Sequence, residues 1–170
     1  MARRHKDTDI FAGPKPKKRD LWKGGIHIPG LGWFPRMSMQ KSLYGVLLAA
    51  AAADGDVHNL ELGEIHVLAE RIKTLSSTPR MKLGKMQAQF KPHLQPKKLL
   101  EFTDLATRRL RSASEDRRAS AFMHALDILF ADRVLTDTER DFVKHLVHKL
   151  RIKDKTAEQC VDVMLTKNRH

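Results

Sequence analysis

Two acidic turns in this chain carry side chains that could bind a cation. Asp54 follows an alanine-rich segment and Glu61 comes seven residues later, while Asp132 follows a second apolar segment with Glu139 at the same spacing. Carboxylate oxygens are the ligands that calcium and magnesium prefer, and they also suit manganese. The sequence therefore offers Asp54, Glu61, Asp132 and Glu139 as candidate ligands of a divalent cation (calcium, magnesium or manganese).

The two turns belong to a longer internal repeat with an offset of 78 positions. At that offset Tyr44 aligns with Phe122, and Ile72 aligns with Leu150. A repeated segment of this size is typical of a duplicated supersecondary unit, here a helix–turn–helix. Duplication predicts that the two copies superpose about an approximate two-fold axis, with both acidic turns on the same side of the protein.

The same acids also have a purely structural interpretation. An Asp at the C-terminal end of a helix meets partial negative charge and needs a partner, which a backbone N–H, a basic side chain or a metal ion can supply. The Glu of each pair lies near the start of the next helix, where it can cap the first turn. In the second copy Arg133 replaces Gly55, and the spacing does not match an EF-hand, because Asn59 stands where its glycine belongs. Both interpretations stay open.

Other candidate sites are weaker. His145 and His148 lie three residues apart near Asp141 and could approach a metal ion, although such residues more often form a solvated face. Cys160 lies among apolar residues with no histidine near it in sequence, which predicts a core thiol. The sequence contains no glycine-rich phosphate loop, nucleophile elbow or zinc-protease motif. We therefore expect no enzymatic activity and no small-molecule substrate.

Composition predicts a soluble, cytoplasmic protein. The 170 residues include 41% apolar residues, enough for a core, and a single cysteine, which excludes an internal disulfide. No apolar stretch reaches the roughly 18 residues of a membrane-spanning helix. The formal net charge is +12, of which residues 1–41 contribute +7. Such a balance predicts an anionic partner or a peripheral association with a membrane surface.

The sequence predicts a basic, Pro/Gly-rich arm at residues 1–37 and a helical domain at residues 38–170. Lys15, Lys17, Lys18 and Arg19 are the candidate contacts to an anionic partner such as a nucleic acid or a membrane, although a basic tail can also serve solubility alone. The stretch 21–35 holds both tryptophans between glycines and prolines, which exclude a regular helix. It either packs across the core or contacts a partner.

Apolar residues recur at spacings of three and four from Ser38 onward, and no alternating strand pattern appears anywhere. In the first segment this pattern places Leu43, Val46, Leu47 and Ala50 on one face. The fold class predicted is all-α, a compact bundle of about seven helices. The expected helices are 39–53, 59–75, 79–90, 96–111, 115–131, 137–150 and 154–167.

The duplicated turns resemble those of a known family. The resemblance rests on two segments, Leu48–Val57 with Glu61 and Ala125–Leu135 with Glu139. They are similar to the TerB-like domain of tellurite-resistance proteins, which is related in fold to the N-terminal domain of the DjlA membrane co-chaperone. The resemblance covers about residues 39–165. It implies a non-enzymatic helical domain with a divalent cation at its paired acidic turns, in stress-response proteins at or near the membrane.

The resemblance and the residues together predict a binding or scaffold module that has a protein partner, a membrane surface, or both. The alternative is a nucleic-acid-binding helical protein. It would act through the basic arm and through arginine-rich helix ends at Arg108, Arg109, Arg111, Arg117 and Arg118.

Overall fold

The computed structural model describes residues 26–28, 32–34, 36–55, 59–131 and 135–168. The chain divides into two units, Met1–Arg36 and Met37–His170, and each is described by itself.

A two-stranded hairpin is the described part of the first unit. Strands β1 (Ile26–Ile28) and β2 (Gly32–Phe34) pair in the antiparallel sense, with Ile26 opposite Phe34. The sequence analysis expected no strand, which is wrong for this stretch. Each strand has only three residues, which is too short for a two-residue alternation to be distinguished from chance.

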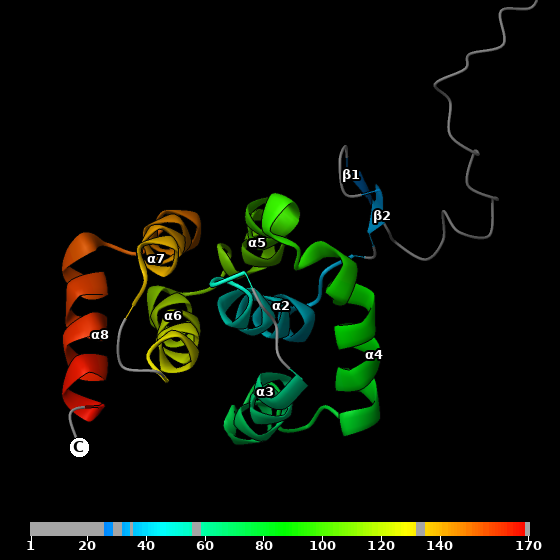
Figure 1. Cartoon of the computed structure of the whole chain (residues 1–170), viewed down its shortest axis with the longest axis horizontal. Helices are drawn as coiled ribbons and strands as arrows, with labels where there is room; N and C mark the ends of the chain where they lie inside the picture. The colour runs from blue at the N-terminus through cyan, green and yellow to red at the C-terminus, as the bar shows by residue number, and fades with distance from the viewer. Residues whose placement is uncertain (1–25, 29–31, 35, 56–58, 132–134, 169–170) are drawn as a thin grey trace, which may run out of the picture. The chain divides into compact units, whose positions relative to one another are not determined.

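The second unit confirms the all-α fold class. Its described residues form seven α-helices and one short 3₁₀ helix (Figure 1). They are α2 (Met39–Ala51), α3 (Asn59–Arg71), α4 (Arg80–Phe90), η1 (Lys91–His93), α5 (Pro96–Leu110), α6 (Glu115–Leu129), α7 (Asp137–Leu150) and α8 (Asp154–Lys167).

Most helix boundaries follow the capping residues that the sequence contains. The Ser38 hydroxyl accepts a hydrogen bond from the Lys41 N–H at the start of α2, and Pro96 occupies the first position of α5. Pro79 was expected as the first residue of α4, but it is the cap itself, with extended ψ of 141°. The helix therefore begins one residue later, because the Pro79 carbonyl accepts the first hydrogen bonds from Lys82 and Leu83.

Helix α2 lies at the centre of the bundle. It packs against α3, α4, α5 and α6, while α7 packs on α5 and α6, and α8 packs on α6 (Figure 1). Every residue from Ser42 to Ala51 is buried. The periodicity placed Leu43, Val46, Leu47 and Ala50 on one face, and the structure buries the other faces of the helix as well. Surrounding helices cover all its sides, so its burial extends beyond the single face that periodicity indicated.

A glycine sets how closely the central helix approaches α5. A Cβ atom built at Gly45 would lie 3.2 Å from the Ala106 Cβ and 3.3 Å from the Phe102 Cζ. Ala106 cannot move aside without moving its helix, because its side chain has no rotatable bond. Small residues on both helices thus permit this close packing, and the alanine run that follows in α2 is buried throughout.

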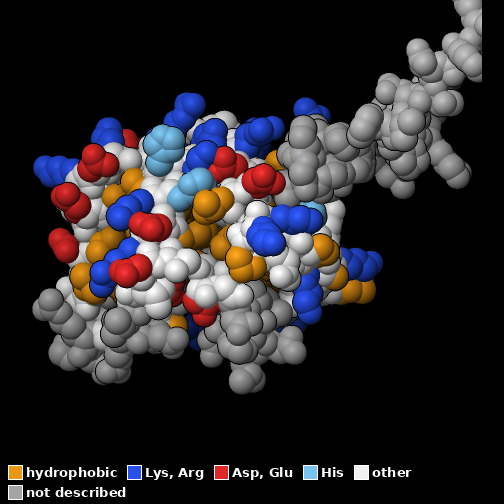
Figure 2. Space-filling view, turned by 45° about the horizontal axis from the view of Figure 1, so that its top comes forward, with side chains coloured by type: hydrophobic (Ala, Val, Ile, Leu, Met, Phe, Trp, Pro, Cys, Tyr) orange, Lys and Arg blue, Asp and Glu red, His pale blue; other side chains and the backbone are white. Residues whose placement is uncertain are grey.

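The outer surface of the bundle is polar and mixed in charge. Figure 2 shows lysine and arginine side chains among carboxylates on the visible face, with histidines near its upper part. None of the described helices is long and apolar enough to cross a membrane.

Alanine substitutions at two helical glycines should separate packing from helix propensity. Gly84 lies in α4 with nothing within 4 Å of its built Cβ, so Gly84→Ala should stabilise the protein by about 0.5–1 kcal/mol. Gly45→Ala makes the same backbone change but overpacks the α2–α5 contact, which costs about 1–3 kcal/mol. We expect its free energy of unfolding, measured by urea titration, to fall below that of Gly84→Ala by this amount. Equal values for the two variants would contradict the close packing.

Candidate functional site

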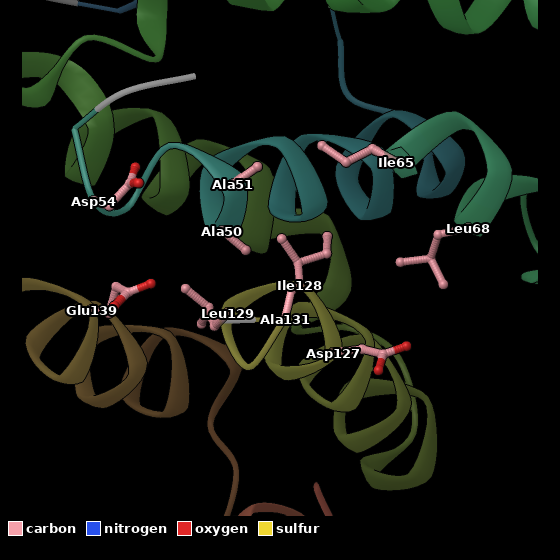
Figure 3. A pocket seen from close by; sticks show the side chains of 10 residues that line it. All are labelled: Ala50, Ala51, Asp54, Ile65, Leu68, Asp127, Ile128, Leu129, Ala131 and Glu139. Carbon is pink, nitrogen blue, oxygen red and sulfur yellow. The ribbon is translucent and has the colours of Figure 1, made fainter. Parts of the chain in front are cut away.

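A pocket of about 250 Å³ lies between α2, α3, α6 and α7. Most of its lining is apolar, and carboxylates occupy its ends (Figure 3). The lining residues are Ala50, Ala51, Asp54, Ile65, Leu68, Asp127, Ile128, Leu129, Ala131 and Glu139.

The pocket brings together one acid from each copy of the repeat. Asp54 lies in the turn after α2, where Gly55 adopts a positive φ of 99°, and Glu139 lies in the first turn of α7. Figure 3 shows both carboxyl groups at the same end of the pocket. Two of the four predicted ligands therefore line one cavity. Asp132 and the side chain of Glu61 lie outside the described residues, as do Lys15, Lys17, Lys18 and Arg19 of the basic arm.

Glu139 already has a structural role. Its Oε2 atom accepts hydrogen bonds from the Thr136 N–H at 2.7 Å and from the Thr136 hydroxyl at 2.8 Å. The Thr136 hydroxyl in turn accepts from the Glu139 N–H at 3.3 Å, which completes the capping box. The structural interpretation of this residue is thus correct. Its Oε1 atom takes no hydrogen bond from a described residue, so one oxygen remains for a ligand.

A third carboxylate, Asp127, was missed by the sequence analysis. It lies on α6 at the other end of the pocket (Figure 3). Its carboxylate forms an ion pair with Lys167 of α8. The repeat could not have identified it, because the first copy has Ala49 at the corresponding position. Lys167 therefore supplies the opposite charge at this end of the pocket.

The histidine cluster that the sequence suggested on α7 does not form. Asp141 pairs with Lys144 at 3.0 Å on the exposed side of the helix. His145 instead faces α5, where its Nε2 atom lies 2.8 Å from a carboxylate oxygen of Asp104. The second oxygen of Asp104 accepts a hydrogen bond from Lys149 at 2.5 Å. These residues join α5 to α7 and form no metal site.

Cys160 is a buried thiol, as its sequence context predicted, and burial raises the pKa of its sulfur. A raised pKa keeps the thiol protonated and unreactive near neutral pH. Among the residues that the structure describes, no three His, Cys, Asp or Glu side chains are grouped closely enough to hold a metal ion. Asp54 and Glu139 could therefore form only part of such a site.

Comparison of the chain with protein-family models, with curated proteins and with solved structures found no match. Its function must be inferred from its own geometry.

Loss of the capping box should destabilise the bundle. Thr136→Ala removes the hydroxyl that caps α7, which should lower the free energy of unfolding by about 1 kcal/mol. Glu139→Gln keeps an oxygen that can accept from the Thr136 N–H, so it should change stability less. Urea titration of the two variants measures both effects. If Glu139→Gln lowered the free energy of unfolding more than Thr136→Ala does, the carboxylate charge of Glu139 would contribute more to stability than the hydroxyl cap.

The half-buried His124 should make stability depend on pH. Burial lowers its pKa below the ordinary value of 6.5, while nearby Asp127 raises it and Lys167 lowers it. A histidine with a lowered pKa in the folded state binds its proton more weakly than the unfolded chain does. Its contribution to stability is thus complete above about pH 6.5 and falls as the pH drops below that value.

Thermal melts between pH 7.5 and 5 should therefore show a decreasing midpoint, and His124→Gln should weaken this dependence. Burial also lowers the pKa of His93, so part of the decrease should remain. His148→Gln, at an exposed position, is the matched control. If the melting temperatures of the wild type and His124→Gln changed identically with pH, His124 would not contribute to the pH dependence of stability.

Proposed function

We propose that this chain is a non-enzymatic binding module and that its ligand site is the pocket between the two acidic turns. The observation that supports this proposal is the position of Asp54 and Glu139, which come from the two copies of the repeat and line one cavity. Apart from the carboxylates, the described lining consists of alanine, isoleucine and leucine side chains. The described lining includes no Ser, Thr, Cys or His with which a carboxylate could form a nucleophile–base pair, which favours binding over catalysis.

A divalent cation is the ligand that best suits the polar end of the pocket. Asp54 supplies a carboxylate that is exposed, and Glu139 supplies its Oε1 atom while Oε2 caps α7. These are hard oxygen ligands of the kind that calcium, magnesium and manganese take. Capping and ion binding by Glu139 are thus compatible. In this proposal Asp132 and Glu61 supply the further ligands that a complete site needs.

The TerB-like resemblance gives this proposal its biological setting. That resemblance implied an all-helical domain with paired acidic turns. We propose that this chain is likewise a stress-response scaffold that binds a protein partner or a membrane surface. The bound ion would stabilise the pocket. Tellurite resistance is the process in which such domains are expected to act.

Divalent ions should raise the melting temperature of the protein. An ion that binds only the folded state stabilises it by mass action, about 2.7 kcal/mol at a hundred times the dissociation constant. Asp54→Asn removes one charge from the pocket and should abolish most of the ion-dependent rise, with little change in the metal-free melting temperature. Differential scanning calorimetry with and without millimolar calcium, magnesium or manganese measures this effect.

Asp141→Asn is the matched control, because it removes the same charge from an exposed position outside the pocket. Glu139→Gln should weaken the ion effect as Asp54→Asn does, while it retains the helix cap. If the wild type melts at the same temperature with and without each ion, the cation site is rejected. The acidic turns would then be helix caps only.

A further inference from the structure

A second, larger concavity of about 650 Å³ lies on another part of the bundle and has the opposite charge. It is formed by the end of α5, the second half of α7 and the start of α8, and we call it the basic groove. Its lining residues are Arg111, Val143, Lys144, Val147, His148, Lys149, Arg151, Ile152 and Asp154. Four of them carry a permanent positive charge and one is acidic.

Two of the four cations form ion pairs with carboxylates that the structure describes. Lys149 pairs with Asp104, and Lys144 pairs with Asp141. Arg111 and Arg151 have no ion pair with any residue that the structure describes. Like charges held close together repel each other, so an anion from outside the chain would complete the groove.

Hydrogen bonds to backbone carbonyls link arginines near the ends of α5, α6 and α7. Arg118 of α6 donates to the Arg111 carbonyl at 3.3 Å and to the Ala113 carbonyl at 3.2 Å. Arg111 donates through Nε to the Lys149 carbonyl at 2.8 Å, two residues before Arg151. The Nε contact fixes the guanidinium of Arg111 and leaves its two terminal nitrogens available. These contacts hold Arg118 against the turn after α5, and Arg111 against the last turn of α7.

The backbone of Arg151 is in a conformation that favours glycine. Its φ is 54° and its ψ is 48°, and it is the one non-glycine residue with positive φ among those described. The turn closes with the Ile152 N–H donating to the Val147 carbonyl at 3.1 Å, so α7 ends in the manner that usually has glycine at this position. Glycine at position 151 would make the folded protein more stable than arginine does. The presence of arginine at this position therefore points to a function for its side chain.

We propose that the basic groove binds the phosphate backbone of a nucleic acid, with Arg151 and Arg111 as its phosphate contacts. The planar guanidinium group binds phosphate oxygens in a bidentate manner. Four cations in one groove suit a chain of phosphates better than a single carboxylate. Exposed Arg108 and Arg109 on α5 and Arg117 on α6 add further positive charge to the bundle.

The apolar base of the groove has a place in this proposal. Val143 and Val147 are partly exposed on α7, beside the cations. They can contact sugars and bases without reading sequence, and the described lining of the groove contains no Phe, Tyr or Trp on which a base could stack. Binding is therefore expected to depend on charge and to be largely independent of sequence.

Arg151→Gly tests the proposal because it should affect binding and stability in opposite directions. Glycine relaxes the positive φ, so the melting temperature should rise by roughly 2–4 °C. Loss of the guanidinium should weaken binding of the full chain to a fluorescein-labelled 15-nucleotide DNA by roughly three- to tenfold and lower the slope of log K against log salt by about one. Fluorescence anisotropy from 50 to 200 mM NaCl measures both quantities.

Two further variants make the result specific. Arg71→Ala removes one charge from the exposed end of α3, away from the groove, and should leave the affinity within twofold of wild type. Arg151→Lys keeps the charge and the unfavourable backbone conformation, so it should retain most of the binding and gain no stability. Amide NMR shifts of Lys144, Arg151 and Ile152 should respond to the DNA in the wild type.

The proposal is overturned if Arg151→Gly and Arg71→Ala weaken DNA binding equally, because the contact would then be the general charge of the chain. It is also overturned if polyglutamate or phosphatidylglycerol vesicles bind through Arg151 and the oligonucleotide does not. Binding of polyglutamate through Arg151 would show that an acidic protein segment occupies the groove. Binding of the vesicles through Arg151 would show that the groove contacts a membrane. Neither result bears on the cation pocket, which is a separate site on the bundle.

Discussion

The enclosure of α2 by four other helices is the constraint on which the rest of the structure depends. A helix buried on all sides needs neighbours at short distance, and that distance is set by its small residues: Gly45 facing Ala106, and the alanines at its C-terminal end. Because buried apolar area is the main source of folding free energy, this helix organises the bundle. The turn that follows it then places Asp54 beside α7, and α5 and α6 are held where their ends meet the end of α7. Both candidate binding regions follow from this packing.

Local sequence signals were enough to predict the helices, because each signal acts within a few residues. The capping box at Thr136 and Glu139, Ser38 before α2 and Pro96 at the start of α5 all work within one helical turn. The hairpin at 26–34 and the start of α4 were not predicted correctly. A three-residue strand depends on its pairing partner rather than on its own pattern, and proline is compatible with both the cap and the first position of a helix.

The candidate site was predictable only as far as the repeat extends. The offset between copies drew attention to Asp54 and Glu139, and both line one cavity. The cation site built on these two residues with Glu61 and Asp132 stays a prediction. The pairs of Asp127 with Lys167 and of Asp104 with His145 join residues about 40 positions apart, and no local pattern encodes such partners. The strained Arg151 was equally invisible, because a residue's φ is set by the turn it closes and not by its type.

The position of α8 at the edge of the bundle has a consequence for the acidic pocket. This helix packs chiefly on α6, and it buries few residues, Ala157, Cys160 and Met164 among them. An edge helix that packs chiefly on one neighbour opens more readily than the whole protein unfolds, and hydrogen exchange would report it as a separate cooperative unit. Each opening event would carry Lys167 away from Asp127 and expose an uncompensated charge in the pocket wall. The charge of the pocket is thereby coupled to a local equilibrium at the C-terminal end of the chain.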